Sequence, residues 1–442
     1  MLGGLFASRQ VRQAFDSTAL VQGWLDAEAA LARAEADVGV IPAEAAERIE
    51  QEARAEHFDL ERLGAEIGDS QHPLVPLVRA LAERCGEDAG AYVHWGATTQ
   101  DIIDTGLVLQ IRTALVPIRE LLGRAVRAAA TLARTGRDLA MAGRTHGQHA
   151  VPITFGLKVA TWTDELQRCE ERLEVAAARV ATGQLAGAAG TLASLGSDAL
   201  PVRAAFCRIL ELAEPDVPWH TTRDRLRDLA HALAEIGAAG ERIAAEVIRL
   251  QATETAEVAE PQRPASVGSS TMPQKRNPMT SEYVVASARL LRGSVSVLFE
   301  APAHAGERDM GIWAAEWIAL PQALVLTGGL LEKLAAILEG LVVDGERMRA
   351  NLGLTRGAIL AEAAMMELAR AIGHEHAHAL VTRVTRRAEV DGLTLADALR
   401  ADPEARAHLS AAALEGFERP EEYVGVAARV SEAAASRVEG RG

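Results

Sequence analysis

The chain has 442 residues and a formal net charge of −15, and this acidic excess argues against nucleic acid as its main partner. Aromatic residues make up only 4% of the chain and helix formers such as Ala, Leu, Glu and Arg dominate it, which predicts a mainly α-helical protein. No signal peptide or membrane-spanning run is evident, and the widely spaced cysteines show neither disulfide nor zinc spacing. We therefore expect a cytoplasmic protein without a membrane partner.

In the first part of the chain, the helical spacing of apolar residues predicts an amphipathic helix over Ser17–Val38, which Gly39 should end. A second helix is predicted over 43–55. The helical pattern is then interrupted by two polar, turn-rich segments, at 68–76 and 92–104. The first segment holds His72, and the second offers the side-chain donors Thr98, Thr99 and Gln100.

Long helices are predicted for the middle of the chain, over 105–137, about 154–181, 223–253, from 278 onward and over 311–339. Helices this long, with one apolar stripe each, are typical of a bundle. The Gly-rich segment 142–156 between two of them is predicted to be a turn, and the small residues of 182–196 a tight loop. Helices shorten after Asn351. We therefore expect an all-α protein with three helical domains, 1–104, 105–350 and 351–442.

The most distinctive segment is GSSTMPQKRNP, at 268–278. Its glycine and prolines exclude a helix interior, so it is predicted to be a loop. A solvated surface loop is one interpretation. The other is a site for a small polyanion, most simply a di- or tricarboxylate, because Lys275 and its neighbours concentrate positive charge in an acidic protein. Proton removal next to a carboxylate needs cationic and amide donors. The candidates for this role are Lys275, Asn277, Thr98, Thr99 and Gln184.

This loop resembles the signature GSSxMPxKxNP of the fumarase/aspartase superfamily, and HWGATTQD and GRTHGQHAVPITFG match the other two regions of that superfamily in order. The resemblance implies a central five-helix bundle that pairs in a homotetramer, with each active site shared between chains. It also implies that Ser269 is the catalytic base and His146 the general acid, with His149 behind it. His72 and Arg308 are implied substrate contacts. They lie in HPLVPLVRALAE and ERDMGIWAAEW, respectively.

No cofactor is expected, because the sequence contains neither a dinucleotide-binding fingerprint nor a P-loop. In GHEHAHA, at 373–379, His374 and His378 are four residues apart and would share a helix face, as zinc ligands can. No third ligand is evident in the sequence, so we expect a solvent-exposed helix start there and no metal.

Within the superfamily, the segments LDAEAALARAEADVG, PWHTTRDR, ERDMGIWAAEW and PEEYVG resemble the 3-carboxy-cis,cis-muconate cycloisomerases. Adenylosuccinate lyases instead use a serine and an arginine, where Gly311 and Trp317 stand here, to hold a nucleotide phosphate. They also have an early arginine where this chain has Ser8. Bacterial cycloisomerases often carry TWLQ where this chain has THGQ. This departure keeps open a fumarate-releasing lyase of substituted succinates. A third hypothesis is an inactive structural homologue, against which the intact loop argues.

Overall fold

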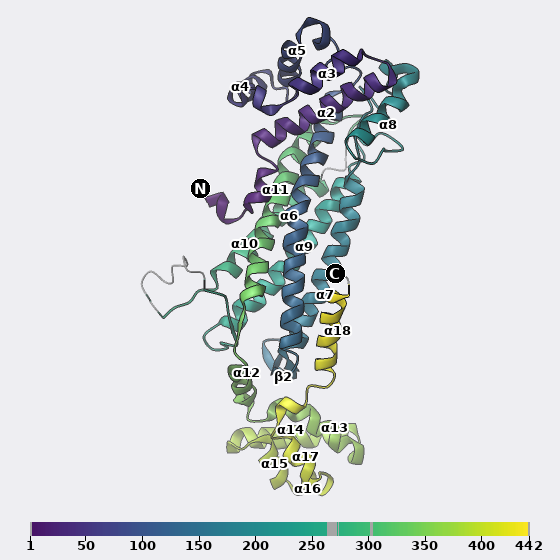
Figure 1. Ribbon diagram of the computed structural model, residues 1–442. Coiled ribbons are helices and arrows are strands. Elements are labelled where there is room, and N and C mark those ends of the chain that lie inside the picture. The colour runs from purple at the N-terminus through teal and green to yellow at the C-terminus, as the bar shows by residue number, and fades with distance from the viewer. Residues whose placement is uncertain (1, 263–271, 273, 301–303, 441–442) are drawn as a thin grey trace. The chain divides into compact units, whose positions relative to one another are not determined.

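The computed structural model describes residues 2–262, 272, 274–300 and 304–440. The chain forms two compact units: unit 1 comprises 1–122, 169–240 and 283–332, and unit 2 comprises 123–168, 241–282 and 333–442. Both units are built mainly of helices (Figure 1). The predicted all-α class is therefore confirmed, while the domain boundaries at 104 and 350 stay a prediction.

The long helices contribute residues to both units, and they are α6 (Thr99–Thr135), α7 (Phe155–Val180), α9 (Asp224–Gln251), α10 (Met279–Glu300) and α11 (Met310–Gly340). Unit 1 also contains α1 (Arg9–Gln13), α2 (Ser17–Val38), α3 (Ala43–Glu52), α4 (Leu60–Ser70), α5 (Val75–Gly90) and α8 (Ala199–Ile209). Its short 3-10 helices are η1 (Leu2–Leu5), η2 (Ala55–His57) and η3 (Ala193–Asp198).

The remaining helices of unit 2 are α12 (Gly345–Leu352), α13 (Ala361–Ile372), α14 (His374–Asp391), α15 (Leu395–Ala401), α16 (Pro403–His408), α17 (Ala411–Gly416) and α18 (Ala427–Glu439). Its 3-10 helices are η4 (Gly353–Thr355), η5 (Ala358–Leu360) and η6 (Pro420–Glu422). Two antiparallel strand pairs complete its description, β1 (Ala140–Thr145) with β2 (Gln148–Thr154) and β3 (Val258–Ala259) with β4 (Val342–Val343).

Local signals set the bounds of α2, which are the predicted ones. The Asp16 side chain accepts a hydrogen bond from the backbone N–H of Ala19 at the start of the helix. At its end, Gly39 adopts φ 88°, a left-handed conformation that glycine reaches without strain, and its N–H bonds back to Ala36. The predicted helix over 43–55 is also present, as α3, and it ends earlier, at Glu52.

The apolar stripe predicted along 223–253 is buried, as a bundle helix requires. Each of its members in α9 is at most 2% exposed: Leu226, Leu229, Leu233, Ile236, Ile243, Val247 and Leu250. After Asn351 the helices shorten, as expected. They enclose a hydrophobic cluster that also includes Ala142 of β1 and in which Leu360, Leu368, Leu380 and Leu399 are at most 1% exposed.

Two predicted local structures were wrong. The segment 142–156 is a β-hairpin rather than a simple turn, since β1 and β2 pair from Ala140↔Thr154 to Thr145↔Gln148 around the residues His146 and Gly147. Both turn residues have positive φ, 53° and 76°, as a two-residue hairpin turn requires. The polar segment 92–104 is also partly helical, because α6 begins at Thr99. There the Asp101 carboxylate accepts from the backbone N–H of Thr98, an N-terminal capping bond.

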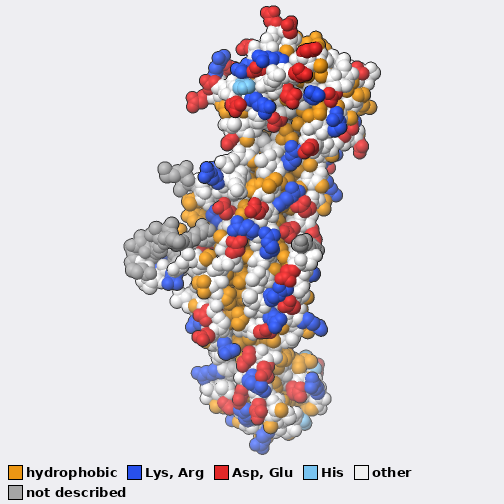
Figure 2. All heavy atoms as spheres, in the orientation of Figure 1, with side chains coloured by type: hydrophobic (Ala, Val, Ile, Leu, Met, Phe, Trp, Pro, Cys, Tyr) orange, Lys and Arg blue, Asp and Glu red, His pale blue; other side chains and the backbone are white. Residues whose placement is uncertain are grey.

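None of the described helices combines the length and the apolar character needed to cross a bilayer. On the face drawn in Figure 2, acidic and basic side chains are intermixed, and hydrophobic side chains lie along the long helices. Several large apolar residues of unit 1 on these helices are more than one-third exposed, among them Val116, Val175, Leu290, Phe299 and Ile318. These side chains leave apolar surface uncovered within one chain.

Candidate active site

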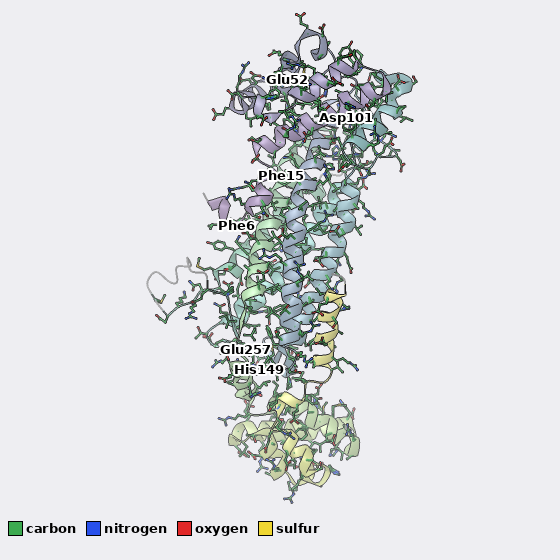
Figure 3. The ribbon with its side chains drawn as sticks, viewed as in Figure 1. Phe6, Phe15, Glu52, Asp101, His149 and Glu257 are labelled. Carbon is green, nitrogen blue, oxygen red and sulfur yellow. The ribbon has the colours of Figure 1, made fainter. Side chains whose placement is uncertain are left out.

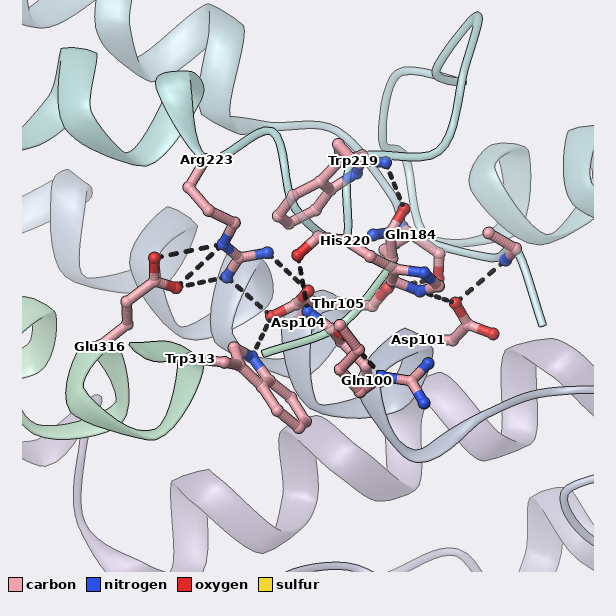
Figure 4. Close-up of polar contacts among 12 residues, drawn as sticks. Gln100, Asp101, Asp104, Thr105, Gln184, Trp219, His220, Arg223, Trp313 and Glu316 are labelled. Carbon is pink, nitrogen blue, oxygen red and sulfur yellow. Dashed lines mark hydrogen bonds and ion pairs between the residues drawn. The ribbon is translucent and has the colours of Figure 1, made fainter. Parts of the chain in front are cut away.

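The first turn of α6 carries Asp101, a fully buried carboxylate that binds three segments of unit 1 (Figure 4). It accepts hydrogen bonds from the backbone N–H groups of Thr98, Ala186 and Gly187 at 2.9–3.0 Å. Its Oδ1 also lies 2.8 Å from Nε2 of the buried His220. Hydrogen bonds to a carboxylate are among the stronger ones in proteins. Asp101 therefore fastens the loop after α7 and the PWHT segment to the start of α6.

Gln184, a predicted substrate donor, lies in this fastened loop and is fully buried. Its backbone N–H and C=O both bond to the Thr105 hydroxyl, at 3.0 and 3.1 Å. Its side-chain oxygen accepts from the backbone N–H of Trp219 at 3.3 Å. The side-chain nitrogen Nε2, however, has no hydrogen-bond partner among the described residues. A buried N–H group without a partner is costly, which makes this nitrogen a candidate donor for a group that the described residues do not supply.

Arg308 joins the same group of residues. Its Nε donates to the side-chain oxygen of Gln100 at 2.9 Å, and its Nη2 donates to the backbone carbonyl of Ala188 at 3.1 Å. Gln100 in turn donates to the carbonyl of His220 at 2.9 Å. The structure thus connects three elements that carry the predicted residues Thr98, Gln184 and Arg308. Thr98 and Thr99 themselves are half-buried at the start of α6.

His72 has a local role in addition to any contact with substrate. Its Nδ1 accepts from the backbone N–H groups of Val75 at 3.1 Å and Leu74 at 3.4 Å, at the start of α5. The imidazole is half-buried. Among the described residues, no hydrogen bond or ion pair joins His72 to Asp101 or Arg308. Its participation in the site therefore stays a prediction.

Next to this group lies a buried ionic network that sequence reasoning did not foresee (Figure 4). Arg223 is 1% exposed and forms two bonds with Asp104, at 2.7 and 2.9 Å, and further bonds with Glu316. Burial raises the pKa of Glu316, and Arg223 offsets this only in part. Trp313 donates to Asp104 at 2.9 Å, and the Trp219 ring lies 4.9 Å from the guanidinium carbon. In the sequence, this network was indicated only by the charged residues of PWHTTRDR and ERDMGIWAAEW.

In unit 2, the hairpin β1–β2 presents His146, the predicted general acid, at its exposed turn. Arg144, two residues earlier, forms a bidentate pair with Glu257 at 2.6 and 2.9 Å. His149 lies opposite Arg144 in the hairpin register and close to Glu257 (Figure 3). Burial, together with the Arg144 cation, lowers the pKa of His149. Its predicted place behind His146 stays a prediction.

The signature loop is described in part. Ser269 lies outside the described residues. Lys275 and Asn277 are exposed and follow one another along the segment that leads into α10. The backbone carbonyl of Arg276, between them, accepts from the side chain of Gln251 at 3.1 Å. Both predicted substrate-binding side chains are therefore on a segment tied to the end of α9.

The predicted site residues thus form two groups, each within one unit. Unit 1 holds His72, Thr98, Thr99, Gln184 and Arg308; unit 2 holds His146, Lys275 and Asn277. The expected assembly of both groups into one site stays a prediction. At the GHEHAHA segment, His376 pairs with Glu404 at 2.5 Å. Among the described residues, no group of three or more His, Cys, Asp or Glu could hold a metal ion.

Long helices whose polar interruptions carry amide and cationic donors are typical of the all-helical lyases, which stabilise negative charge next to a carboxylate. A model of the lyase family matches residues 6–293, and a model of the adenylosuccinate lyase C-terminus matches residues 357–434. The chain belongs to the fumarase/aspartase superfamily of lyases and cycloisomerases.

Individual relatives agree with this assignment. The 3-carboxy-cis,cis-muconate cycloisomerase of Pseudomonas aeruginosa is 43% identical over 425 residues, which cover 96% of this chain and 93% of that protein. The crystal structure of 3-carboxy-cis,cis-muconate lactonizing enzyme from Pseudomonas putida has a TM-score of 0.94 and 38% identity, and the match covers 100% of this chain and 99% of that one. The crystal structure of fumarate lyase from Mesorhizobium sp. BNC1 has a TM-score of 0.91 and 38% identity, with 98% of both chains covered.

Proposed function

We propose that this enzyme is a cycloisomerase that acts on a small di- or tricarboxylate of the 3-carboxy-cis,cis-muconate type. The observation that carries the proposal is the side-chain nitrogen of Gln184, which has no hydrogen-bond partner among the described residues and is buried in a loop that Asp101 and Thr105 hold fixed. A fixed neutral donor of this kind suits a substrate carboxylate. Arg308, anchored through Gln100 to the same region, adds the positive charge that an anionic substrate needs.

In the proposed reaction, a substrate carboxylate oxygen adds to a carbon–carbon double bond and the adjacent carbon takes up a proton. In the reverse direction, a base removes that proton and the carboxylate leaves. We assign proton transfer at carbon to Ser269. We assign the role of general acid to His146. Lys275 and Asn277, with the donors of unit 1, hold the second carboxylate, where negative charge accumulates in the transition state. A serine can act as a base only where cations and amides stabilise its oxyanion, and Lys275 is the nearby cation in sequence.

A second candidate is a fumarate-releasing lyase of substituted succinates. His146 supports it, because an imidazole at the hairpin turn can protonate a departing amine or thiolate. The similarity to a fumarate lyase structure also supports it. A nucleotide substrate has less support. Gly311 offers no side chain, the Trp317 ring packs edge-to-face on Trp313 with centroids 4.8 Å apart, and Ser8 is only 4% exposed.

We also propose a cytoplasmic homotetramer. The exposed apolar side chains along α6, α7, α10 and α11 support association through the long helices, because uncovered apolar surface on a bundle is typical of a protein interface.

The deciding experiment is product analysis by NMR in D₂O with the purified enzyme. We expect 3-carboxy-cis,cis-muconate to give a lactone that carries one deuterium on the carbon next to the ring-closing position. N- and S-substituted succinates should give no fumarate, which absorbs near 240 nm. Fumarate release from a succinate, without lactone formation from the muconate, would establish the second candidate instead. Turnover of neither class would contradict both.

A further inference from the structure

Two carboxylates in one short segment of unit 2, Glu257 and Glu260, hold different parts of the chain that carry predicted site residues. The segment 257–260 follows α9 and contains β3, which pairs with β4 through Val258↔Val343 and Ala259↔Val342. The two side chains bind different partners, so this one segment contacts both the β1–β2 hairpin and the start of α10.

Glu257 holds the hairpin that carries His146. Its side chain is fully buried, and both its oxygens accept from the Arg144 guanidinium, at 2.6 and 2.9 Å. Asn351 of α12 donates a further bond to the same carboxylate at 2.8 Å. A bidentate pair fixes the plane of the guanidinium as well as its distance. Because Arg144 lies in β1 two residues before His146, this pair restrains the position of the hairpin turn.

Glu260 holds the segment that carries Lys275 and Asn277. Its carboxylate accepts from the backbone N–H groups of Thr280 and Ser281, at 3.1 and 2.5 Å, and so caps the start of α10. Its own N–H donates to the side-chain oxygen of Gln251 at 2.8 Å. The amide nitrogen of Gln251 donates in turn to the carbonyl of Arg276. The segment on which Lys275 and Asn277 lie is therefore held at Arg276 and again at the start of α10.

The segment 257–260 is itself held firmly. The N–H of Glu257 donates to the Leu250 carbonyl at 2.8 Å, and its own carbonyl accepts from Asp344 at 3.0 Å. Next to it, Pro261 packs against Gly340 so closely that a Cβ on that glycine would lie 2.6 Å from the proline Cβ. Because these contacts restrict its movement, the segment 257–260 can fix the positions of both the hairpin and the segment that leads into α10.

We propose that 257–260, which we name the carboxylate bracket, is the positioning element of the unit 2 half of the active site. Glu257 sets the position of His146, and Glu260 with Gln251 sets the positions of Lys275 and Asn277. This proposal rests on the proposed function only for the roles of His146, Lys275 and Asn277. Neither glutamate touches substrate; both act through the residues that they hold.

The test compares Glu257→Gln and Glu260→Gln in the full-length enzyme. In Glu257→Gln the new amide group faces the guanidinium of Arg144, so the bidentate pair is lost and the hairpin turn moves. We expect kcat to fall roughly tenfold to hundredfold while KM stays within about twofold, because His146 acts in the chemical step. In Glu260→Gln the new amide group faces the N–H groups of α10. We expect KM to rise roughly tenfold, because Lys275 and Asn277 bind the carboxylate in the ground state.

Two variants serve as controls. Glu254→Gln removes an exposed charge just before the bracket and should leave both constants unchanged. Glu260→Asp keeps an anionic acceptor at the start of α10 and should recover part of the lost affinity. The bracket does not position the site if kcat and KM of both glutamine variants equal those of Glu254→Gln. The same conclusion follows if each glutamine variant shows both a lower kcat and a higher KM.

Hydrogen–deuterium exchange provides a readout that does not depend on substrate. We expect faster amide exchange in 140–154 for Glu257→Gln and in 274–284 for Glu260→Gln, each without the other. If the variants show this exchange pattern but the wild-type enzyme is inactive, the bracket is retained and the proposed function is refuted. If the wild-type enzyme is active and both variants show unchanged exchange and unchanged kinetics, the proposed function is retained and the bracket is refuted.

Discussion

At the scale of single residues, two of the buried carboxyl groups of unit 1 lie in opposite environments. Asp101 is surrounded by donors: the N–H groups of Thr98, Ala186 and Gly187 and the ring of His220. Glu35 of α2 is equally buried, yet neither of its side-chain oxygens has a hydrogen-bond partner among the described residues. Burial, with a smaller contribution from the charge of Glu28, raises the pKa of Glu35 to about 9. The fold therefore holds Glu35 in its protonated form at neutral pH.

This environment makes Glu35 a source of pH-dependent instability. Its pKa in the unfolded chain is 4.5 and in the folded chain about 9, so between these values the unfolded chain loses a proton that the folded chain keeps. Folding stability should then fall as pH rises across this window, by up to about 1.4 kcal/mol per pH unit. Glu35→Gln removes the titration, so its stability relative to the wild type should increase from pH 5 to pH 8.

Urea denaturation at several pH values measures this difference. Glu47→Gln, which changes an exposed residue of α3, is the matched control and should follow the wild-type pH dependence. Parallel curves for Glu35→Gln and the wild type would show that Glu35 does not titrate as proposed.

At the scale of elements, helices α2 and α6 approach each other through glycines. A Cβ placed on Gly106 of α6 would lie 2.7 Å from Cδ1 of Trp24 and 3.1 Å from the backbone of Gly23, both in α2. Such distances leave no room for a methyl group. The contact matters for the site because α6 also carries Asp101 and Thr105 at its start.

Gly106→Ala should therefore destabilise the protein by roughly 1–3 kcal/mol, the usual effect of overpacking. The matched control is Gly64→Ala in α4, where the added methyl group meets nothing within 4 Å. That change should stabilise the protein by about 0.5–1 kcal/mol, because alanine favours the helix. Thermal and urea unfolding of both variants measure the effects. Equal shifts of the same sign would contradict the close packing of α2 on α6.

The elements that the sequence predicted well are those with local signals. The bounds of α2 follow from Asp16 and Gly39, and the stripe of α9 follows from its spacing. The hairpin was missed because glycine, histidine and proline in 142–156 favour turns, while pairing of β1 with β2 decides the outcome. The network of Arg223 with Asp104 and Glu316 joins residues 119 and 93 positions apart, so no local pattern could reveal it. Gln184 and Arg308 stay predicted substrate contacts, and the part of Asp101 in holding the Gln184 loop could be seen only in the fold.

At the scale of the whole molecule, the family assignment rests on matches that cover nearly the full chain. The described site residues fall into one group in each compact unit, and Ser269 lies outside the described residues. We interpret both groups as parts of active sites that combine regions from different chains of a homotetramer. On this account, Ser269 and His146 are both essential, and the two residues that serve one site belong to different chains.

The most direct test of this account is to mix two inactive variants, Ser269→Ala and His146→Ala. Each alone should lose roughly a thousandfold in turnover, the usual effect of removing such a group, about 4 kcal/mol. After subunit exchange, verified by mass spectrometry of differently tagged chains, some sites of the mixed tetramers would contain neither mutation. Activity should then return to a measurable fraction of the wild-type value. Verified exchange without any recovery, or an active monomer by light scattering, would contradict the shared site.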